Sequence, residues 1–218
     1  MPDITDLPKH KVVTRQEWDQ LRANLLQKEK ELTKQRDSLA EEIRSLPWLK
    51  IEKNYVFQTK TGNKTLIELF ENKSQLVVYH FMFSPGGKPC RSCSFWADNF
   101  NGPRYHLPQR DVTFKVISKA PLEEIEPYRK RMGWEFDWVS SFNTDFNSDF
   151  EVSTVEGEQP GLSVFYRDGD NVYLSYTSRK RGMEFLNPVY GILDLVPKGR
   201  DEKGLEWPMA WVKPHDEY

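Results

Sequence analysis

Long hydrophobic runs, excess positive charge and phosphate-binding motifs are all missing from this sequence. No apolar segment approaches the ~20 residues that a helix needs to cross a membrane, so no membrane partner is expected. Met1 to Asp6 show neither the positively charged region nor the apolar region of a secretory signal, which predicts a cytoplasmic protein. The 31 Lys and Arg against 33 Asp and Glu leave a net charge of −2 and no basic field for nucleic acid. Without a Gly-x-Gly-x-x-Gly or phosphate-loop motif, no nucleotide cofactor is expected.

The chain does contain enough apolar material for a folded core. Hydrophobic residues make up 38% and aromatic residues 13% of the 218 residues, which excludes wholesale disorder. This length suits one large domain, or one domain with an extension. The texture of the sequence divides it into an N-terminal helical arm, residues 1–50, and a domain, residues 51–218.

The arm begins with a helix-start signal. Thr14 and Glu17 form a capping box, and the helix is predicted to run to about Ser45, before Pro47. A narrow apolar stripe recurs every seven residues along it, at Trp18, Leu25, Leu32, Leu39 and Leu46. The stripe can pack on the chain's own domain or on a second copy. A helix of roughly 48 Å would overhang a compact domain, so we favour a homodimer through this helix.

The domain alternates strand and helix patterns. Two near-continuous apolar runs predict buried strands at Gln75–Phe83 and Val112–Ser118. The other expected elements are helices at Ser94–Phe100 and Pro121–Met132, a short strand at Trp134–Trp138, an irregular stretch at Phe142–Gly161, and a hairpin of Val164–Arg167 with Val172–Tyr176. A last helix is expected at about Glu184–Leu195, disturbed at Pro188. This order predicts an α/β protein of the thioredoxin-like type, with a central mixed sheet and helices on both faces.

The two cysteines of the chain lie in one tetrapeptide, Cys90-Arg91-Ser92-Cys93. A disulfide across two residues constrains the unfolded chain little, so this spacing indicates redox or metal chemistry rather than a structural bridge. The motif follows a buried strand and opens a predicted helix, whose N-terminus would stabilise a Cys90 thiolate, with Arg91 adding positive charge nearby. Cys90 would then attack a disulfide and Cys93 would resolve the mixed disulfide.

Other chemistries for the cysteine pair have weaker support. A structural zinc site needs four ligands, whereas the motif supplies two, and His80 and His106 form no His-x₃₋₅-His pair. A c-type haem site needs a histidine where Ser94 stands. Peroxiredoxins carry Pro and Thr or Ser at the positions of Phe83 and Gly87. We therefore expect no metal and no cofactor, although two inert cysteines remain an alternative.

Several segments resemble one known family over nearly the whole chain, the helical start included. They are Leu66-Ile67-Glu68-Leu69-Phe70, Gln75 to Phe83, Cys90 to Phe100, Gly161-Leu162-Ser163-Val164-Phe165 and Leu193-Asp194-Leu195-Val196-Pro197-Lys198-Gly199-Arg200. These segments are similar to domain-of-unknown-function family 899 (DUF899). The resemblance implies a thioredoxin-like fold but supplies no reaction or substrate.

Further candidate site residues come from the resemblance to thioredoxins. His80 aligns with a buried acid of the strand before the cysteines and would take the proton of Cys93, unless it is a plain core histidine. Pro160, five residues before Phe165, matches the proline that faces the cysteines and could form a cis bond with Gln159, or a trans bond at a strand start. Trp96, in the helix after the motif, lies in the core or lines a groove near the cysteines.

These observations lead to one leading function and one rival. The leading function is a thiol–disulfide oxidoreductase that acts on a protein or small-molecule thiol or disulfide, with Arg91, Trp96 and Pro160 near the substrate. The rival is a redox-inert binding or assembly protein on the same fold.

Overall fold

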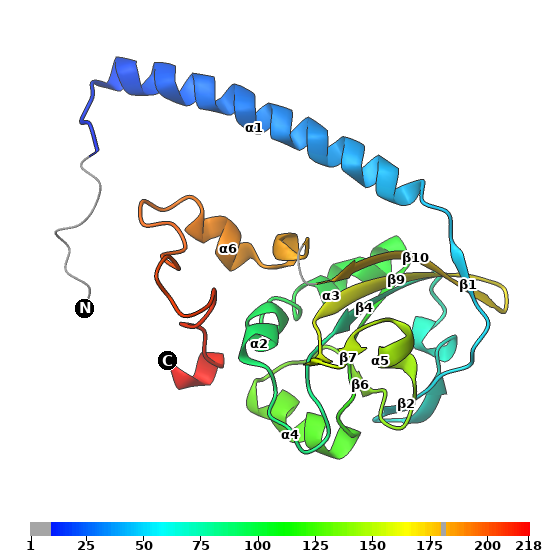
Figure 1. Cartoon of the computed structure of the whole chain (residues 1–218). Coiled ribbons are helices and arrows are strands. Elements are labelled where there is room, and N and C mark those ends of the chain that lie inside the picture. The colour runs from blue at the N-terminus through cyan, green and yellow to red at the C-terminus, as the bar shows by residue number, and fades with distance from the viewer. Residues whose placement is uncertain (1–9, 180–181) are drawn as a thin grey trace. The chain divides into compact units, whose positions relative to one another are not determined.

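The computed structural model describes residues 10–179 and 182–218 (Figure 1). The chain forms two compact units, Met1–Pro47 and Trp48–Tyr218. The helices are α1 (Arg15–Arg44), α2 (Arg91–Ala97), α3 (Pro103–His106), α4 (Leu122–Arg131), α5 (Phe146–Asp149) and α6 (Pro188–Leu193), with 3-10 turns η2 (Glu68–Phe70), η3 (Leu107–Arg110), η4 (Glu184–Leu186) and η5 (His215–Glu217). The strands are β1 (Leu49–Ile51), β2 (Val56–Thr59), β3 (Gly62–Thr65), β4 (Gln75–His80), β5 (Val112–Ser118), β6 (Trp138–Ser140), β7 (Ser153–Thr154), β8 (Gly157–Glu158), β9 (Gly161–Asp168) and β10 (Asn171–Arg179).

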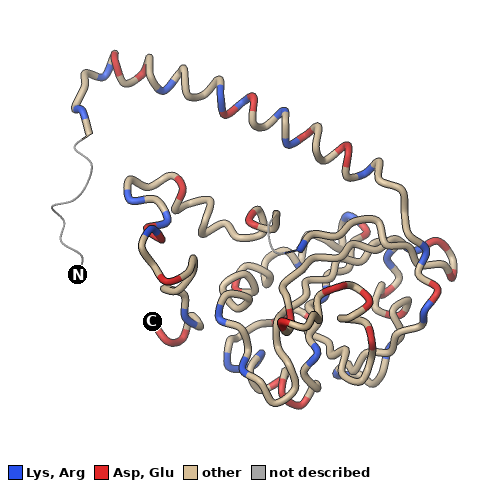
Figure 2. Tube along the Cα trace, viewed as in Figure 1, with Lys and Arg blue, Asp and Glu red and all other residues tan. Residues whose placement is uncertain are grey.

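The first unit is the helix α1, and its start confirms the predicted capping box. The Thr14 hydroxyl accepts from the Glu17 backbone N–H at 3.2 Å, and the Glu17 carboxylate accepts from the Thr14 N–H at 3.0 Å. Basic and acidic residues are interspersed along α1 (Figure 2), and Arg22 pairs with Glu29 at 2.7 Å. A single helix has no second element to bury its apolar stripe against, and no residue of α1 is buried.

The second unit is built on an eight-stranded mixed sheet of order β1-β10-β9-β4-β5-β6-β2-β3. β4, β5 and β6 run parallel, while β9 and β10 form an antiparallel hairpin whose first strand pairs with β4. This combination of a strand–helix–strand half with a hairpin half is the thioredoxin-like fold that the sequence predicts. The motif helix α2 thus starts near the carboxyl end of β4, a central strand.

The two faces of the sheet carry separate hydrophobic clusters. One cluster joins Tyr79, Val116 and Trp138 of the strands to Cys93 of α2 and Ile125 of α4. The opposite cluster is covered by η2 and α5, and its members include Phe70, Leu76, Val78, Phe146 and Phe165. Helical turns therefore cover both faces, as the burial of the apolar strands requires.

Two segments differ from the sequence-based expectation by more than their bounds. Trp134, Phe136 and Trp138 are buried between exposed Glu135 and Asp137, but only Trp138 enters a strand, which continues to Ser140. The stretch expected to be irregular, Phe142–Gly161, contains α5 and the two-stranded ladder of β7 and β8. At Trp134–Trp138, the alternation of aromatic and acidic residues predicted burial correctly. A strand also needs hydrogen bonds to a neighbouring strand, and the pairing of β6 with β5 begins only at Trp138.

The C-terminal segment after β10 packs against the motif helix. Its helix α6 contributes Tyr190 and its later turns contribute Val212, and both are buried with Phe95 of α2 in a third cluster. Phe95 meets the Tyr190 ring edge-on at 5.4 Å and the Trp211 ring at the same distance. Residues far apart in the sequence thus form one wall beside the cysteines.

Candidate functional site

Cys90 and Cys93 lie at the start of α2, and both are free thiols. Cys90 is the N-cap residue: its carbonyl accepts from the Ser94 N–H at 3.0 Å, and its Sγ accepts from the Cys93 N–H at 3.3 Å. The Cys90 N–H donates to the Met82 carbonyl at 3.2 Å, which ties the motif to the segment just after β4. Cys90 is half-buried, whereas Cys93 is only 2% exposed. One sulfur is accessible, and its partner lies in the core.

This environment separates the acidities of the two thiols. The pKa of Cys90 is lowered to about 7, first by a hydrogen bond from the Cys93 side chain and then by backbone N–H groups of Cys93 and Ser92, against the opposing effect of burial. Burial raises the pKa of Cys93 well above its ordinary value, and the hydrogen bond with Cys90 and the charge of Cys90 raise it further. The pair is thus arranged as a thiolate at Cys90 and a thiol at Cys93.

Tyr79 is a site residue that the sequence analysis missed. It lies on β4, is 1% exposed, and belongs to the same core cluster as Cys93. A hydrogen bond from its side chain lowers the pKa of Cys93, against the larger opposing effect of burial. Alternation along β4 was the available signal, because the residue before His80 must face the opposite side of the sheet.

His80 corrects one sequence-based prediction. Instead of lying under the cysteines, it points to the opposite face of the sheet, where its Nε2 lies 2.8 Å from the Ser163 hydroxyl and its ring 5.7 Å from that of Phe146. Burial, and then the charge of Arg179, lowers the pKa of His80 to about 3. Its contacts are those of a neutral core histidine, so they do not support proton transfer with Cys93.

Pro160 and Trp96 both line a cavity of about 380 Å³ beside Cys93. No cis peptide bond occurs among the described residues, so the bond from Gln159 to Pro160 is trans, one of the two forms that the sequence left open. The trans form is the one that an X–Pro bond ordinarily prefers. The Trp96 Nε1–H donates to the Met183 carbonyl at 3.1 Å, which fixes the indole between the motif helix and the C-terminal segment.

Arg91 does not supply the positive charge beside Cys90 that the sequence analysis expected. Its side chain is exposed, and its guanidinium lies 6.0 Å from the centre of the Trp207 ring. The groups that lower the pKa of Cys90 do not include Arg91. The low pKa of Cys90 therefore comes from hydrogen bonds donated by Cys93 and Ser92 rather than from a neighbouring cation.

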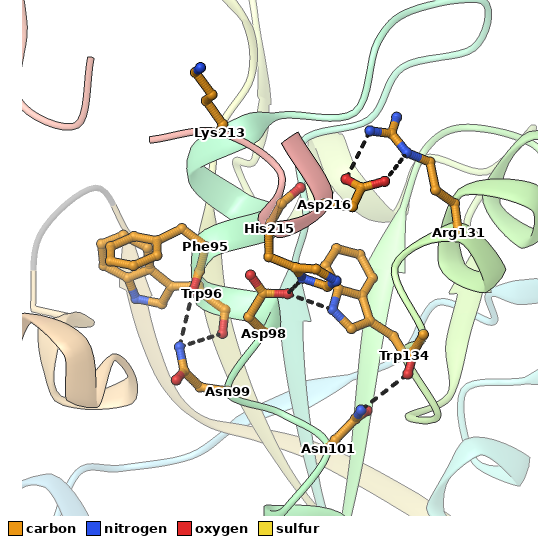
Figure 3. Close-up of polar contacts among 12 residues, drawn as sticks. Phe95, Trp96, Asp98, Asn99, Asn101, Arg131, Trp134, Lys213, His215 and Asp216 are labelled. Carbon is orange, nitrogen blue, oxygen red and sulfur yellow. Dashed lines mark hydrogen bonds and ion pairs between the residues drawn. The ribbon is translucent and has the colours of Figure 1, made fainter. Parts of the chain in front are cut away.

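The end of the chain is fastened next to the site by polar contacts (Figure 3). Asp98, the C-cap of α2, accepts from Trp134 Nε1 at 2.8 Å and lies 2.6 Å from His215 Nδ1. Arg131 of α4 binds both carboxylate oxygens of Asp216, at 2.7 and 2.9 Å. The C-terminal turn is thus attached to two helices of the cysteine face.

Neither a cluster of metal-ligand side chains nor a long apolar helix occurs in the described parts of the chain. Within residues 10–179 and 182–218, no three His, Cys, Asp or Glu side chains gather as a metal site would require. No helix in the same residues combines the length and apolar composition that a bilayer crossing demands.

Comparisons with known proteins cover most of the chain. A family model described as "Bacterial protein of unknown function (DUF899)" matches residues 7–218. None of the curated proteins is similar enough to match.

Solved structures give more distant matches. A mutant of PrxQ from Xylella fastidiosa is 17% identical, with a TM-score of 0.48 over 63% of this chain and 89% of that one. Peroxiredoxin Q from Xanthomonas campestris is 15% identical, with a TM-score of 0.46 over 64% and 89%. A candidate thiol:disulfide interchange protein DsbE from Chlorobium tepidum is 13% identical, with a TM-score of 0.46 over 67% and 95%. At these identities and TM-scores, the matches say nothing about a reaction.

Proposed function

The chain belongs to the DUF899 family, and we propose that it is a thiol–disulfide oxidoreductase whose redox pair is Cys90 and Cys93. One observation carries the proposal: a half-buried sulfur with a pKa of about 7 accepts hydrogen bonds from the residue that holds the second, buried sulfur. Low-pKa, partly accessible thiols are the reactive ones, while buried structural cysteines are inert.

In the first step, the Cys90 thiolate attacks one sulfur of a substrate disulfide. The Cys90–substrate S–S bond forms, the substrate S–S bond breaks, and the other half leaves as a thiolate that takes a proton from water. The rate depends on the thiolate fraction, which at pH 7 is about one half for a group with this pKa. Hydrogen bonds from Cys93 and Ser92 keep Cys90 in the reactive form.

In the second step, Cys93 attacks Cys90 Sγ and releases the second substrate half as a thiol. Cys93 must lose its proton as it attacks, and burial disfavours the resulting charge. The thiolate leaving the mixed disulfide can take that proton, and the Tyr79 hydroxyl stabilises the developing Cys93 thiolate by hydrogen bonding. Two electrons pass from the cysteine pair to the substrate disulfide. The substrate halves take one proton from water and one from Cys93, which leaves two substrate thiols and a Cys90–Cys93 disulfide.

The reduction potential of the pair tests the proposal. We expect equilibration with glutathione or dithiothreitol buffers to give one two-electron transition between about −270 and −120 mV, the range of active thioredoxin-like proteins. A Cys93→Ser chain is the matched control, because it keeps the attacking thiol and can form no intramolecular disulfide. Failure of the full chain to form that disulfide at any potential would leave the redox-inert binding protein as the better description.

A further inference from the structure

The cavity beside the cysteine pair is walled by two distant parts of the chain. The motif side contributes Cys93 and Trp96, and the segment after β10 contributes Met183, Tyr190, Trp207 and Met209. Its volume of about 380 Å³ suits a small organic molecule, since ligand pockets usually range over about 300–1,000 Å³. Cys93 stands in the wall itself, so a bound molecule lies next to the redox pair.

The charged groups at the cavity already have partners within the protein. The Arg200 guanidinium binds both oxygens of Asp194 at 2.7 Å and lies 4.2 Å from the Tyr190 ring centre. One oxygen of Glu202 accepts from the Tyr190 hydroxyl at 2.7 Å and the Trp211 indole at 3.0 Å. A ligand is therefore met mainly by thioether, proline and aromatic surfaces, while burying a charged ligand without a counter-charge is costly.

The segment that forms the outer wall is held in place at both ends. At its start, the Met183 carbonyl accepts from the Trp96 indole. At its end, His215 and Asp216 bind Asp98 and Arg131 (Figure 3). Between these points, Tyr190 and Val212 are buried against α2. A disulfide in the surface of a folded protein would have to displace this wall to reach the pair from the cavity side.

We propose that the cavity makes this protein selective for low-molecular-weight disulfides with apolar, in particular aromatic, substituents. This inference rests on the proposed redox function and names its substrate class. One substituent occupies the cavity against Trp96 and Trp207 while the linked sulfur is attacked by Cys90, which is hydrogen-bonded to the wall residue Cys93. The exchange is the one described above: the cysteine pair loses two electrons, and the substrate becomes two thiols by taking one proton from water and one from Cys93.

The test follows oxidation of the reduced full chain by three disulfides in single-turnover stopped flow. The reagents are 4,4′-dithiodipyridine, which is neutral and aromatic, glutathione disulfide, which is charged, and insulin, a protein. Trp207→Ala removes one aromatic wall, and Met209→Trp fills the cavity from the same segment. Leu195→Ala is the matched control, because Leu195 lies in that segment, is 84% exposed and is not part of the wall.

We expect both wall variants to slow the reaction with the aromatic disulfide by about three- to tenfold, the range set by the loss of one aromatic contact. The same variants should leave glutathione disulfide within twofold of wild type, and Trp207→Ala should react with insulin no more slowly than wild type. Leu195→Ala should match wild type with every reagent.

Equal slowing for all three reagents, or no slowing for the aromatic one, would refute the selectivity while the Cys90–Cys93 disulfide still formed. A chain that none of the three reagents oxidises would instead remove the proposed function and this inference with it. Near-ultraviolet circular dichroism of each variant shows whether it has folded. If one of the two wall variants does not fold, the other still tests the selectivity.

Discussion

The acidity of Cys90 should depend on the side chain at position 93. The Cys93 thiol is the first of the groups that lower the pKa of Cys90 to about 7, ahead of the backbone N–H groups. Cys93→Ala removes that donor and keeps the backbone, so we expect the Cys90 pKa to rise by about one unit, or ~1.4 kcal/mol. At pH 7, the thiolate fraction would then fall from about one half to about one tenth.

A rate measured at a single pH would underestimate this change. A thiolate of higher pKa is intrinsically more nucleophilic, which offsets about threefold of the loss for each unit. The assay is therefore the full pH dependence of iodoacetamide alkylation, or of the thiolate absorbance in the ultraviolet, in Cys93→Ala and in Cys93→Ser. The serine hydroxyl can still donate, so Cys93→Ser should keep the Cys90 pKa near 7. Identical pKa values for the alanine variant and wild type would refute this reasoning.

Three further outcomes follow from the fold. Tyr79→Phe should slow resolution of a Cys90 mixed disulfide by about tenfold, whereas His80→Ala should leave the rate unchanged; single-turnover thiol release measures both. A slower rate in His80→Ala and an unchanged rate in Tyr79→Phe would show that His80, and not Tyr79, assists Cys93. Phe146→Ala, at a fully buried position, should lower the free energy of unfolding by about 3–5 kcal/mol in urea titration, and a loss below 1 kcal/mol would contradict the packing. We propose that α1 mediates a homodimer, so Leu32→Glu should convert a dimer to a monomer in sedimentation; a monomeric wild type at tens of micromolar would refute it.

The central strands could be predicted well because a run of apolar residues in a short segment is enough to indicate a buried strand. The expected strand Val112–Ser118 coincides with β5, and the turn after Asp168 joins β9 to β10 as predicted. Gln75–Phe83 was too long by three residues, since β4 ends at His80. Apolar runs and turn residues are local signals, so their interpretation needed no knowledge of the rest of the fold.

The site was only partly predictable, because its other parts depend on long-range contacts. The spacing of Cys90 and Cys93 indicated the pair, but nothing local showed which of Tyr79 and His80 faces it, and the face chosen for His80 was wrong. The cavity wall comes from residues about a hundred positions after the motif, such as Trp207. No periodicity or spacing in the sequence connects segments so far apart.

The cap that Cys90 provides for α2 links oxidation to folding. In the reduced protein, a charged sulfur accepts the Cys93 N–H, whereas a disulfide sulfur is neutral and a weaker acceptor. The unfolded chain has no such cap, and a bridge across two residues restricts it little. Oxidation should therefore lower the melting temperature.

The stability difference between the reduced and oxidised forms depends on pH, and the sign of this dependence follows from the lowered pKa of Cys90. The extra stability of the reduced form is fully present above the unfolded thiol pKa of about 8.5, and it is lost as the pH falls through about 7. Folding and oxidation form a closed thermodynamic cycle. The decrease in the free energy of unfolding on oxidation therefore equals the free energy by which folding makes the disulfide more oxidising, at about 1.4 kcal/mol for each 30 mV of reduction potential. Two melting curves, one reduced and one oxidised, therefore measure how far folding shifts the reduction potential, without any redox buffer.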